Sequence, residues 1–404
     1  MDNLYTEAFA LDGQKVWYSV MPYNMLYCLD LETSENRFVD VFPENYCGHV
    51  RLHCRAIKKK NKIYFIPDSG GYIHVLYLHT GTIKAIEIEA AESDIRFLDA
   101  VEHDGKIFMF CNGDKLRIYC FDTEEEICKP LEMVCDGIAG RVMKYPEKIG
   151  QKVYLAGSEY PQIVIFDCEE NRLETLALNE CREGIGTIVY DGNAFWSSTK
   201  TGFVQWNKDG QVLCRIDGFP DEFKTWKFSE AGSVEMADGF YDGGKKNEFP
   251  FWASAVIDDK VYFLSRMTNM NVAIDLHTQE VSKASFPDEE ETEETLLRER
   301  VTCNHYFGEK IGETLYISSS CSGKFYIISP KGKKEYTLAR DRKDETACFR
   351  QRGTNFKYRI FHENDEVTLP KYISYLCEDD SISRHASMEN KGNIIYQTIK
   401  EVGR

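Results

Sequence analysis

Short apolar runs recur along the chain, and a turn followed by a lysine introduces most of them. The first five lie about 42 to 47 residues apart, which is the period of one blade of a β-propeller. Their apolar content and their length of about five residues are typical of buried strands. The runs lie at 13–18, 61–65, 105–110, 151–155, 192–196, 259–263 and 313–317.

A second pattern follows each of these runs. It consists of an apolar-alternating strand, a turn rich in Asp, Asn, Gly and Thr, and a further alternating strand. The turn residues have a physical reason, because Asn and Asp side chains accept hydrogen bonds from nearby backbone N–H groups and tolerate positive φ. The seven copies lie at 26–33, 75–81, 118–123, 164–168, 204–210, 272–278 and 326–332.

These two patterns together predict four-stranded antiparallel blades. We therefore expect an all-β fold, a seven-bladed β-propeller with short C-terminal helices. The propeller spans 1–338, and residues 339–404 form an extension that packs on it. The predicted blades lie near 3–42, 49–88, 94–132, 139–178, 185–216, 252–286 and 301–338.

The repeat resembles the kelch-like group of propellers, whose blades carry an aromatic residue and Asp at the end of a strand, before a turn with Thr or Gly. The resemblance covers about residues 3–338 and implies the fold. It implies no single function, because such propellers include scaffolds and enzymes. The chain departs from the kelch pattern in having the paired glycines only at Gly70-Gly71, and in lacking the Trp of the last strand.

Two insertions interrupt the period. The first, 217–252, carries Trp226 and Trp252; aromatic loops of this length are often functional, and the alternative is a lid that only packs on the propeller. In the second, 287–300, acids precede arginines as in a short solvated helix, with a metal-binding acidic loop as the alternative. Beyond 338, helical spacing recurs at 369–376 and 395–402, although 358–361 could instead form a strand that closes the ring.

Composition narrows the class of protein. The formal net charge is −17, which disfavours nucleic-acid binding and fits a cytoplasmic protein. The N-terminal residues do not resemble a secretion signal, and no apolar stretch is long enough to span a membrane. Fourteen cysteines are then expected as free thiols, and residues such as Cys28, Cys120 and Cys168 as small buried hydrophobes.

One segment, 47–54, is rich in Cys and His and suggests zinc by composition. Strand geometry argues against a shared ion, because alternate side chains point to opposite faces and like-facing neighbours lie roughly 6–7 Å apart. The same alternation predicts that His49, Arg51, His53 and Arg55 share one face of an innermost strand. Arg51, Arg96 and Arg141 occupy similar positions in successive blades and are expected to form an anion-binding pocket at the channel. The alternative is that they pair with acids such as Asp99 or Asp94.

No nucleophile elbow, P-loop, dinucleotide fingerprint or zinc-protease helix is present in the sequence, and 184–187 is too short for a phosphate loop. His305 could act as a general base or serve structure. We therefore expect a non-enzymatic binding or scaffold protein without a cofactor or metal, recognising a protein, a peptide or a small anionic ligand. The alternatives are a propeller lyase or glycan-processing enzyme and a lectin-like carbohydrate binder. The candidate ligand-binding residues are His49, Arg51, His53, Arg96, Arg141, Trp226, Trp252 and His305.

Overall fold

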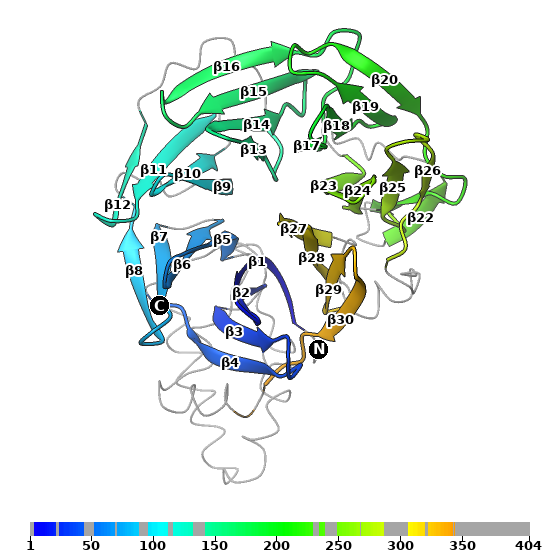
Figure 1. Ribbon diagram of the computed structural model, residues 1–404. Coiled ribbons are helices and arrows are strands. Elements are labelled where there is room, and N and C mark those ends of the chain that lie inside the picture. The colour runs from blue at the N-terminus through cyan, green and yellow to red at the C-terminus, as the bar shows by residue number, and fades with distance from the viewer. Residues whose placement is uncertain are drawn as a thin grey trace, which may run out of the picture.

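The chain folds into a ring of antiparallel sheets around a central channel (Figure 1). The computed structural model describes residues 4–21, 24–43, 52–68, 71–88, 96–111, 116–131, 142–228, 234–238, 249–266, 268–286, 306–319, 322–341 and 343. Within these residues there are seven four-stranded sheets and one two-stranded sheet. The predicted all-β, seven-bladed propeller is therefore confirmed.

The first four blades follow one another without a break in order. Blade one holds β1 (Tyr5–Asp12), β2 (Lys15–Met21), β3 (Met25–Asp30) and β4 (Asn36–Val41). Blade two holds β5 (His53–Lys59), β6 (Lys62–Pro67), β7 (Tyr72–Tyr77) and β8 (Thr82–Glu87). Blade three holds β9 (Phe97–His103), β10 (Lys106–Cys111), β11 (Arg117–Asp122) and β12 (Ile127–Pro130), and blade four β13 (Glu147–Ile149), β14 (Lys152–Ala156), β15 (Gln162–Asp167) and β16 (Arg172–Ala177).

The last three blades are interrupted by one extra hairpin. Blade five holds β17 (Val189–Tyr190), β18 (Phe195–Ser198), β19 (Gly202–Trp206) and β20 (Val212–Asp217). The hairpin of β21 (Lys224–Phe228) and β22 (Val234–Asp238) lies within the first predicted insertion. Blade six holds β23 (Phe251–Ile257), β24 (Lys260–Ser265), β25 (Val272–Asp275) and β26 (Val281–Lys283), and blade seven β27 (Tyr306–Ile311), β28 (Thr314–Ser319), β29 (Lys324–Ser329) and β30 (Gly332–Thr337).

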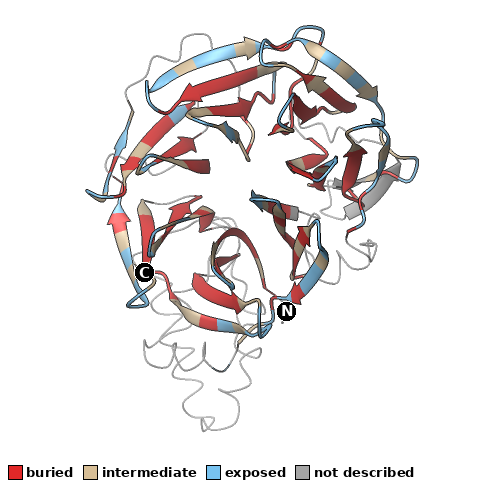
Figure 2. Ribbon diagram, viewed as in Figure 1, coloured by how far each residue is buried: buried red, intermediate tan, exposed pale blue. Residues whose placement is uncertain are grey.

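In every blade the first strand lies at the channel and the fourth at the rim of the ring (Figure 1). The middle strands are buried, whereas the outer strands show alternating or exposed positions (Figure 2). The hairpins that join first to second strands and third to fourth strands lie on the same face of the ring, because neighbouring strands are antiparallel. We call this the hairpin face; the first strands end there.

The turn between the third and fourth strands repeats one device. Asp30, Asp122, Asp167 and Asp275 each accept hydrogen bonds at Oδ1 from the backbone N–H groups two and three residues later. Asn207 accepts the bond from Asp209 in blade five. These bonds satisfy N–H groups at the tip of each hairpin, and they are the physical origin of the Asp-containing repeat in the sequence.

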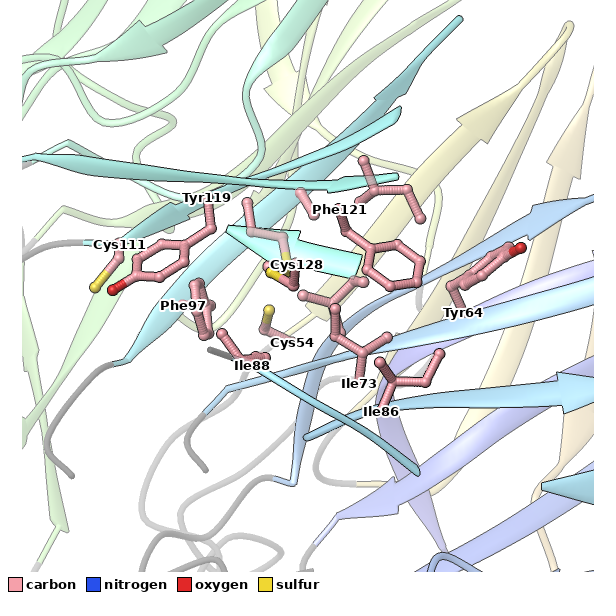
Figure 3. Close-up of a cluster of buried hydrophobic side chains, with 14 of the residues drawn as sticks. Cys54, Tyr64, Ile73, Ile86, Ile88, Phe97, Cys111, Tyr119, Phe121 and Cys128 are labelled. Carbon is pink, nitrogen blue, oxygen red and sulfur yellow. The ribbon is translucent and has the colours of Figure 1, made fainter. Parts of the chain in front are cut away.

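The hydrophobic core lies between blades, with one cluster at each contact. Between blades two and three, side chains from both sheets interlock, among them Tyr64 and Ile73 of blade two and Phe97 and Tyr119 of blade three (Figure 3). The rings of Phe97 and Tyr119 meet edge to face at 5.3 Å, a favourable arrangement for aromatic pairs. Each blade is thus buried by its two neighbours, so that a closed ring leaves no sheet face to solvent.

The ring closes between blades seven and one without exchange of a strand. The backbone N–H of Leu4 donates to the carbonyl of Leu338 over 2.7 Å, and both side chains lie in one buried cluster with Phe325. Asn36 Nδ2 of β4 donates to the carbonyl of Ala339. The chain beyond β30 therefore runs along the outer edge of blade one.

The second insertion and the C-terminal segments discussed above, 287–300, 358–361, 369–376 and 395–402, lie outside the described residues. No helix in the described part of the chain is long and apolar enough to cross a membrane.

Candidate functional site: the central channel

Half of the predicted site residues lie outside the described part of the chain. His49, Arg51, Arg141 and His305 belong to this group. The structure places the other four, Arg96, His53, Trp252 and, by its backbone alone, Trp226.

Arg96 binds an acid of the neighbouring blade. Its Nη2 and Nε lie 3.0 Å and 3.3 Å from Oδ2 of Asp68, which is buried. The side chain of Arg96 is 48% exposed, and it does not line the central channel. This geometry matches the alternative in which the arginines pair with acids, although Asp68 was not among the acids expected.

The prediction that His53 and Arg55 share one face is wrong, because β5 contains a bulge. His53 lies opposite Pro67 and Arg55 opposite Ile66, so Cys54 is the extra residue. A bulge shifts the alternation of side chains by one position. Arg55 consequently lines the channel, whereas His53 is buried between blades.

His53 belongs to a chain of hydrogen bonds that joins blades one and two. Its Nδ1 lies 2.7 Å from Ser19 Oγ and its Nε2 lies 2.8 Å from His74 Nδ1, while His74 Nε2 lies 2.7 Å from the carbonyl of Pro43. A carbonyl only accepts, so His74 Nε2–H donates to it, His53 Nε2–H donates to His74, and the Ser19 hydroxyl donates to His53. Burial lowers the pKa of His53 and that of His74, the latter to about 4. Both rings are neutral links rather than ligand-binding groups.

Trp252 lies in β23, the innermost strand of blade six, and not in a loop. The guanidinium carbon of Arg266 lies 4.5 Å from the centre of its ring, and Lys144 Nζ lies 5.7 Å from it. Trp226 lies in β21 of the extra hairpin. The residues before that hairpin pack on blade six, since Phe223 is buried there and Lys224 N–H donates to Asn269 Oδ1. Their packing agrees with the lid alternative and leaves the prediction of ligand binding untested.

The central channel encloses about 580 Å³ and takes lining residues from the first strand of all seven blades. Its polar and charged lining includes Arg55, Lys58, Glu102, Tyr145, Glu147, Lys148, Tyr190, Ser254, Glu309 and Lys310. A concave site of this size with few convergent polar groups is the default ligand site of a protein.

The hairpin registers place these residues in layers. Three residues are the last paired positions of their first strands before the turns at the hairpin face: Lys59, Ile149 and Ile311. They lie opposite Lys62, Lys152 and Thr314 of the second strands. One residue further inward lie Lys58, Lys148 and Lys310, which we call the lysine layer. One residue further again lie Glu147 and Glu309, which we call the acid layer.

The same tetrapeptide, Glu-Lys-Ile-Gly, supplies both layers from two blades. It occurs as Glu147–Gly150 in blade four and as Glu309–Gly312 in blade seven. Both glycines adopt left-handed backbone, with φ of 60° and 62°, as these tight turns require. The two hairpins face each other across the channel, and Lys310 of one lowers the pKa of Glu147 of the other, although burial has the larger and opposite effect.

Deeper in the channel, one arginine serves two acids. Arg55 Nη2 lies 3.0 Å from Glu309 Oε1, and Arg55 Nε lies 3.6 Å from Asp99 Oδ1. Asp99 Oδ2 also accepts the backbone N–H of Tyr145 over 3.0 Å. Tyr145 has a φ of 56°, which is rare for a bulky residue, and the bond from Asp99 helps to hold this strained backbone in place.

Three carboxyl groups at the channel, those of Asp99, Glu147 and Glu309, have raised pKa values. Burial raises the pKa of Asp99 and of Glu309, while Arg55 opposes both shifts. Burial raises the pKa of Glu147 to about 7. Desolvation therefore outweighs the available positive charge at all three carboxyls.

A buried ion pair crosses the ring beyond these groups. Lys144, just before β13 of blade four, pairs with Glu7 of β1. Burial and the nearby Arg266 lower the pKa of Lys144, and the carboxylate of Glu7 opposes that shift. Since these two blades stand on opposite sides of the ring, the pair restricts the channel on the side away from the hairpin face (Figure 1).

Other candidate chemistry has structural explanations. A Cβ on Gly184 would lie 2.0 Å from the carbonyl oxygen of Ser158, so this glycine permits close packing rather than phosphate binding. Cys28 and Cys168 are buried free thiols whose pKa values burial raises to about 11 and about 12, as expected of small hydrophobes. Among the described residues no group of three or more His, Cys, Asp or Glu side chains could hold a metal ion.

Sequence reasoning missed most of the channel. Glu147, Lys148, Glu309 and Lys310 look like ordinary surface residues in a chain rich in both types. The available signal was the identical tetrapeptide, Glu-Lys-Ile-Gly, at the same register of two blades.

Comparison with known proteins identifies no family for the chain. No protein-family model matches the chain, and no curated protein matches its sequence. Among solved structures, it is similar to the computationally designed Ika8 protein, with 13% identity, a TM-score of 0.48, and coverage of 83% of this chain and 96% of that one. It is also similar to U3-55K, with 10% identity, a TM-score of 0.46, and coverage of 67% of this chain and 77% of that one.

Proposed function

We propose that the protein is a non-enzymatic binding protein whose central channel holds a small polar ligand, with an anionic group of that ligand at the lysine layer. The observation that carries the proposal is the pair Lys148 and Lys310. Both are exposed residues that line the channel from opposite hairpins. Neither forms an ion pair with another described residue, so no acid in the described part of the chain neutralises their charges.

Two further lysines close to this mouth are already neutralised. Lys58 pairs with Asp12 and Lys59 pairs with Glu102, each over 2.9 Å. The chain as a whole carries a formal net charge of −17. Available cations in a concave site of an acidic protein focus the local potential and favour an anion.

Sulfate titration tests this proposal, with thermal unfolding as the readout at constant ionic strength set by sodium chloride. We expect a saturable rise of the melting temperature, because a ligand that binds only the folded state stabilises it. The double variant K148Q/K310Q should weaken the apparent affinity for sulfate about tenfold or more. The matched control K106Q/K331Q removes the same charge from exposed lysines outside the channel lining. Equal loss in both variants, or no saturable effect in the unmodified protein, would contradict the proposal.

One observation favours an enzyme as the second candidate. Glu147 lies in the channel wall with a pKa of about 7, and an acid–base catalyst works best when its pKa is near the ambient pH. Once a ligand has been found, its conversion should be measured in the unmodified protein and in E147Q. Conversion that E147Q abolishes while binding persists would favour the enzyme, and recovery of unchanged ligand from both proteins would exclude it for that ligand.

The remaining expectations stay predictions. A kelch-like relationship, a cytoplasmic location and the lack of nucleic-acid or membrane binding rest on the sequence patterns and on the net charge. Fractionation of cells that produce the protein would test the cytoplasmic location and the lack of membrane binding. A nucleic-acid binding assay at low salt would test the lack of nucleic-acid binding.

A further inference from the structure

The lysine layer and the acid layer differ in their balance of charge. At and below the acid layer lie three carboxyl groups, Asp99, Glu147 and Glu309, and the guanidinium of Arg55 contacts two of them, Asp99 and Glu309. The lysine layer above them provides Lys148 and Lys310. The channel therefore becomes more negative inward over a short distance, since successive residues of a strand advance roughly 3.3 Å.

The inner carboxyls lack sufficient positive partners. Glu309 and Asp99 share Arg55, and the charged group with the largest influence on Glu147 is Lys310 of the opposite hairpin. The pKa values of all three carboxyls are raised, with burial as the largest cause. A cationic group placed among them would replace the solvation that they lost on folding.

The wall between the two layers and Arg55 includes small residues, Ala56, Ala100, Ser254 and Gly308, beside the larger Pro146 and Ile188. Gly308 packs tightly toward blade six, because a Cβ there would lie 2.4 Å from Leu264 Cδ1. The small side chains leave space for a ligand at this depth.

We infer that the ligand of the channel is a zwitterion that points its cationic group inward to Glu147 and Glu309 and leaves its anionic group at Lys148 and Lys310. This inference rests on the proposed function and adds the chemical class of the ligand. The two facing Glu-Lys hairpins give each end of such a molecule two partners of opposite charge. Charge-assisted hydrogen bonds of this kind are about twice as strong as neutral ones.

The lysine layer and the acid layer are one residue apart, which corresponds to roughly 3.3 Å along a strand. A series of linear ω-amino acids therefore tests which separation of the two charged groups fits the two layers. The probes are therefore 4-aminobutyrate, 6-aminohexanoate and 8-aminooctanoate, each compared with the unsubstituted carboxylate of the same length by calorimetric titration at pH 7.5.

We expect at least one ω-amino acid to bind about tenfold or more tightly than its matched carboxylate. In E147Q the preference should fall to about threefold or less, while the affinity for the plain carboxylate stays equal or rises, because a like charge has been removed. E309Q should act in the same direction, and E124Q, which changes an exposed acid outside the channel lining, is the control. Far-ultraviolet dichroism confirms that each variant is folded.

Equal binding of an ω-amino acid and its matched carboxylate at every length would overturn the zwitterion inference and leave the proposed function standing. Preference for the ω-amino acid that E147Q and E309Q leave intact would also overturn it, since the cation would then lie elsewhere. If none of the probes and no sulfate bind, the proposed function itself fails. The two failures are therefore distinct.

Discussion

Arg55 stabilises the deepest part of the channel, where it is the cation shared by Asp99 and Glu309. Asp99 in turn holds Tyr145 in its left-handed conformation through the backbone N–H. One side chain therefore supports groups from three strands, β5, β9 and β27, and the start of a fourth, β13. An arginine is suited to this role because it keeps its charge when buried and offers several N–H donors.

Substitution of Arg55 by Met should destabilise the fold by about 3–5 kcal/mol, because it leaves two carboxyls without their cation in a desolvated site. Urea unfolding measures the change. The triple variant R55M/D99N/E309Q should regain part of the lost free energy of unfolding, because the two uncompensated carboxylate charges have also been removed. The control is R172M, an arginine that is 57% exposed with acid neighbours, whose loss should cost under about 1 kcal/mol. If R55M costs no more than R172M, Arg55 does not stabilise the channel.

The linked rings of His53 and His74 make stability sensitive to acid. Their pKa values in the folded state lie below 6.5, and that of His74 is about 4. The unfolded chain therefore takes up protons first as the pH falls, so the stabilisation is complete above about pH 6.5 and is lost progressively toward pH 4. Between pH 7.5 and 4.5 the loss from His74 alone should be about 2–3 kcal/mol.

The variant H74Q isolates this effect. Its unfolding free energy should be lower than that of the unmodified protein at pH 7.5 and should fall less steeply with acid. H277Q, which removes a histidine that is 74% exposed, should leave the slope unchanged. Parallel curves for H74Q and the unmodified protein would show that the chain of rings does not hold both histidines neutral.

Residue types alone could not locate the site. The composition of the Cys- and His-rich segment made His53 a candidate ligand-binding residue. In the structure His53 is buried and hydrogen-bonds side chains of blades one and two. Lysine and glutamate are common in this chain, so Lys148 and Glu147 gave no compositional signal. Only the hairpin register gathers them with Lys310 and Glu309 in two layers.

At the scale of elements, the blade repeat could be predicted because five of the seven blades use the same Asp or Asn turn chemistry. Asp30, Asp122, Asp167 and Asp275 recur since each caps the same hairpin. The face of β5 could not be predicted, because the bulge at Cys54 adds a residue that local sequence does not reveal. A single extra residue moves every side chain on one side of the bulge to the opposite face of the strand from the one that alternation predicts.

Asp167 gives a test of the turn device. Its Oδ1 accepts the N–H groups of Glu169 and Glu170, each over 3.0 Å, and Gln151 donates to its Oδ2. D167A should destabilise the protein by about 1 kcal/mol, and D167N should retain most of that stability, because its amide oxygen can accept the same bonds. Thermal unfolding compares the two. Equal loss in both variants would mean that the carboxylate charge, and not the turn geometry, is what matters.

At the scale of the whole molecule, seven blades and their order follow from the repeat, but the closure of the ring does not. A propeller can close by exchanging a strand between its first and last blades, and a sequence pattern does not exclude that. Here all four strands of blade one come from the N-terminal residues, and those of blade seven are likewise continuous. Closure depends on packing around Leu4, Phe325 and Leu338 and on one backbone bond.

Truncation of Leu338 to Ala tests this closure. The side chain is fully buried, so its loss should cost about 2–5 kcal/mol. Leu213 on the outer strand of blade five is 51% exposed, and L213A should change stability by less than about 0.5 kcal/mol. A cost for L338A as small as that of L213A would show that the ring does not depend on this junction.

The central claim is that the channel, entered from the hairpin face, binds anions at Lys148 and Lys310. Bromide soaked into crystals of the protein tests it most directly, because its anomalous scattering locates the ion without assumptions about a ligand. We expect a bromide peak in the channel beside Nζ of Lys148 or Lys310, and no such peak in crystals of K148Q/K310Q. Bromide peaks on the outer surface alone, with none inside the channel of the unmodified protein, would contradict it.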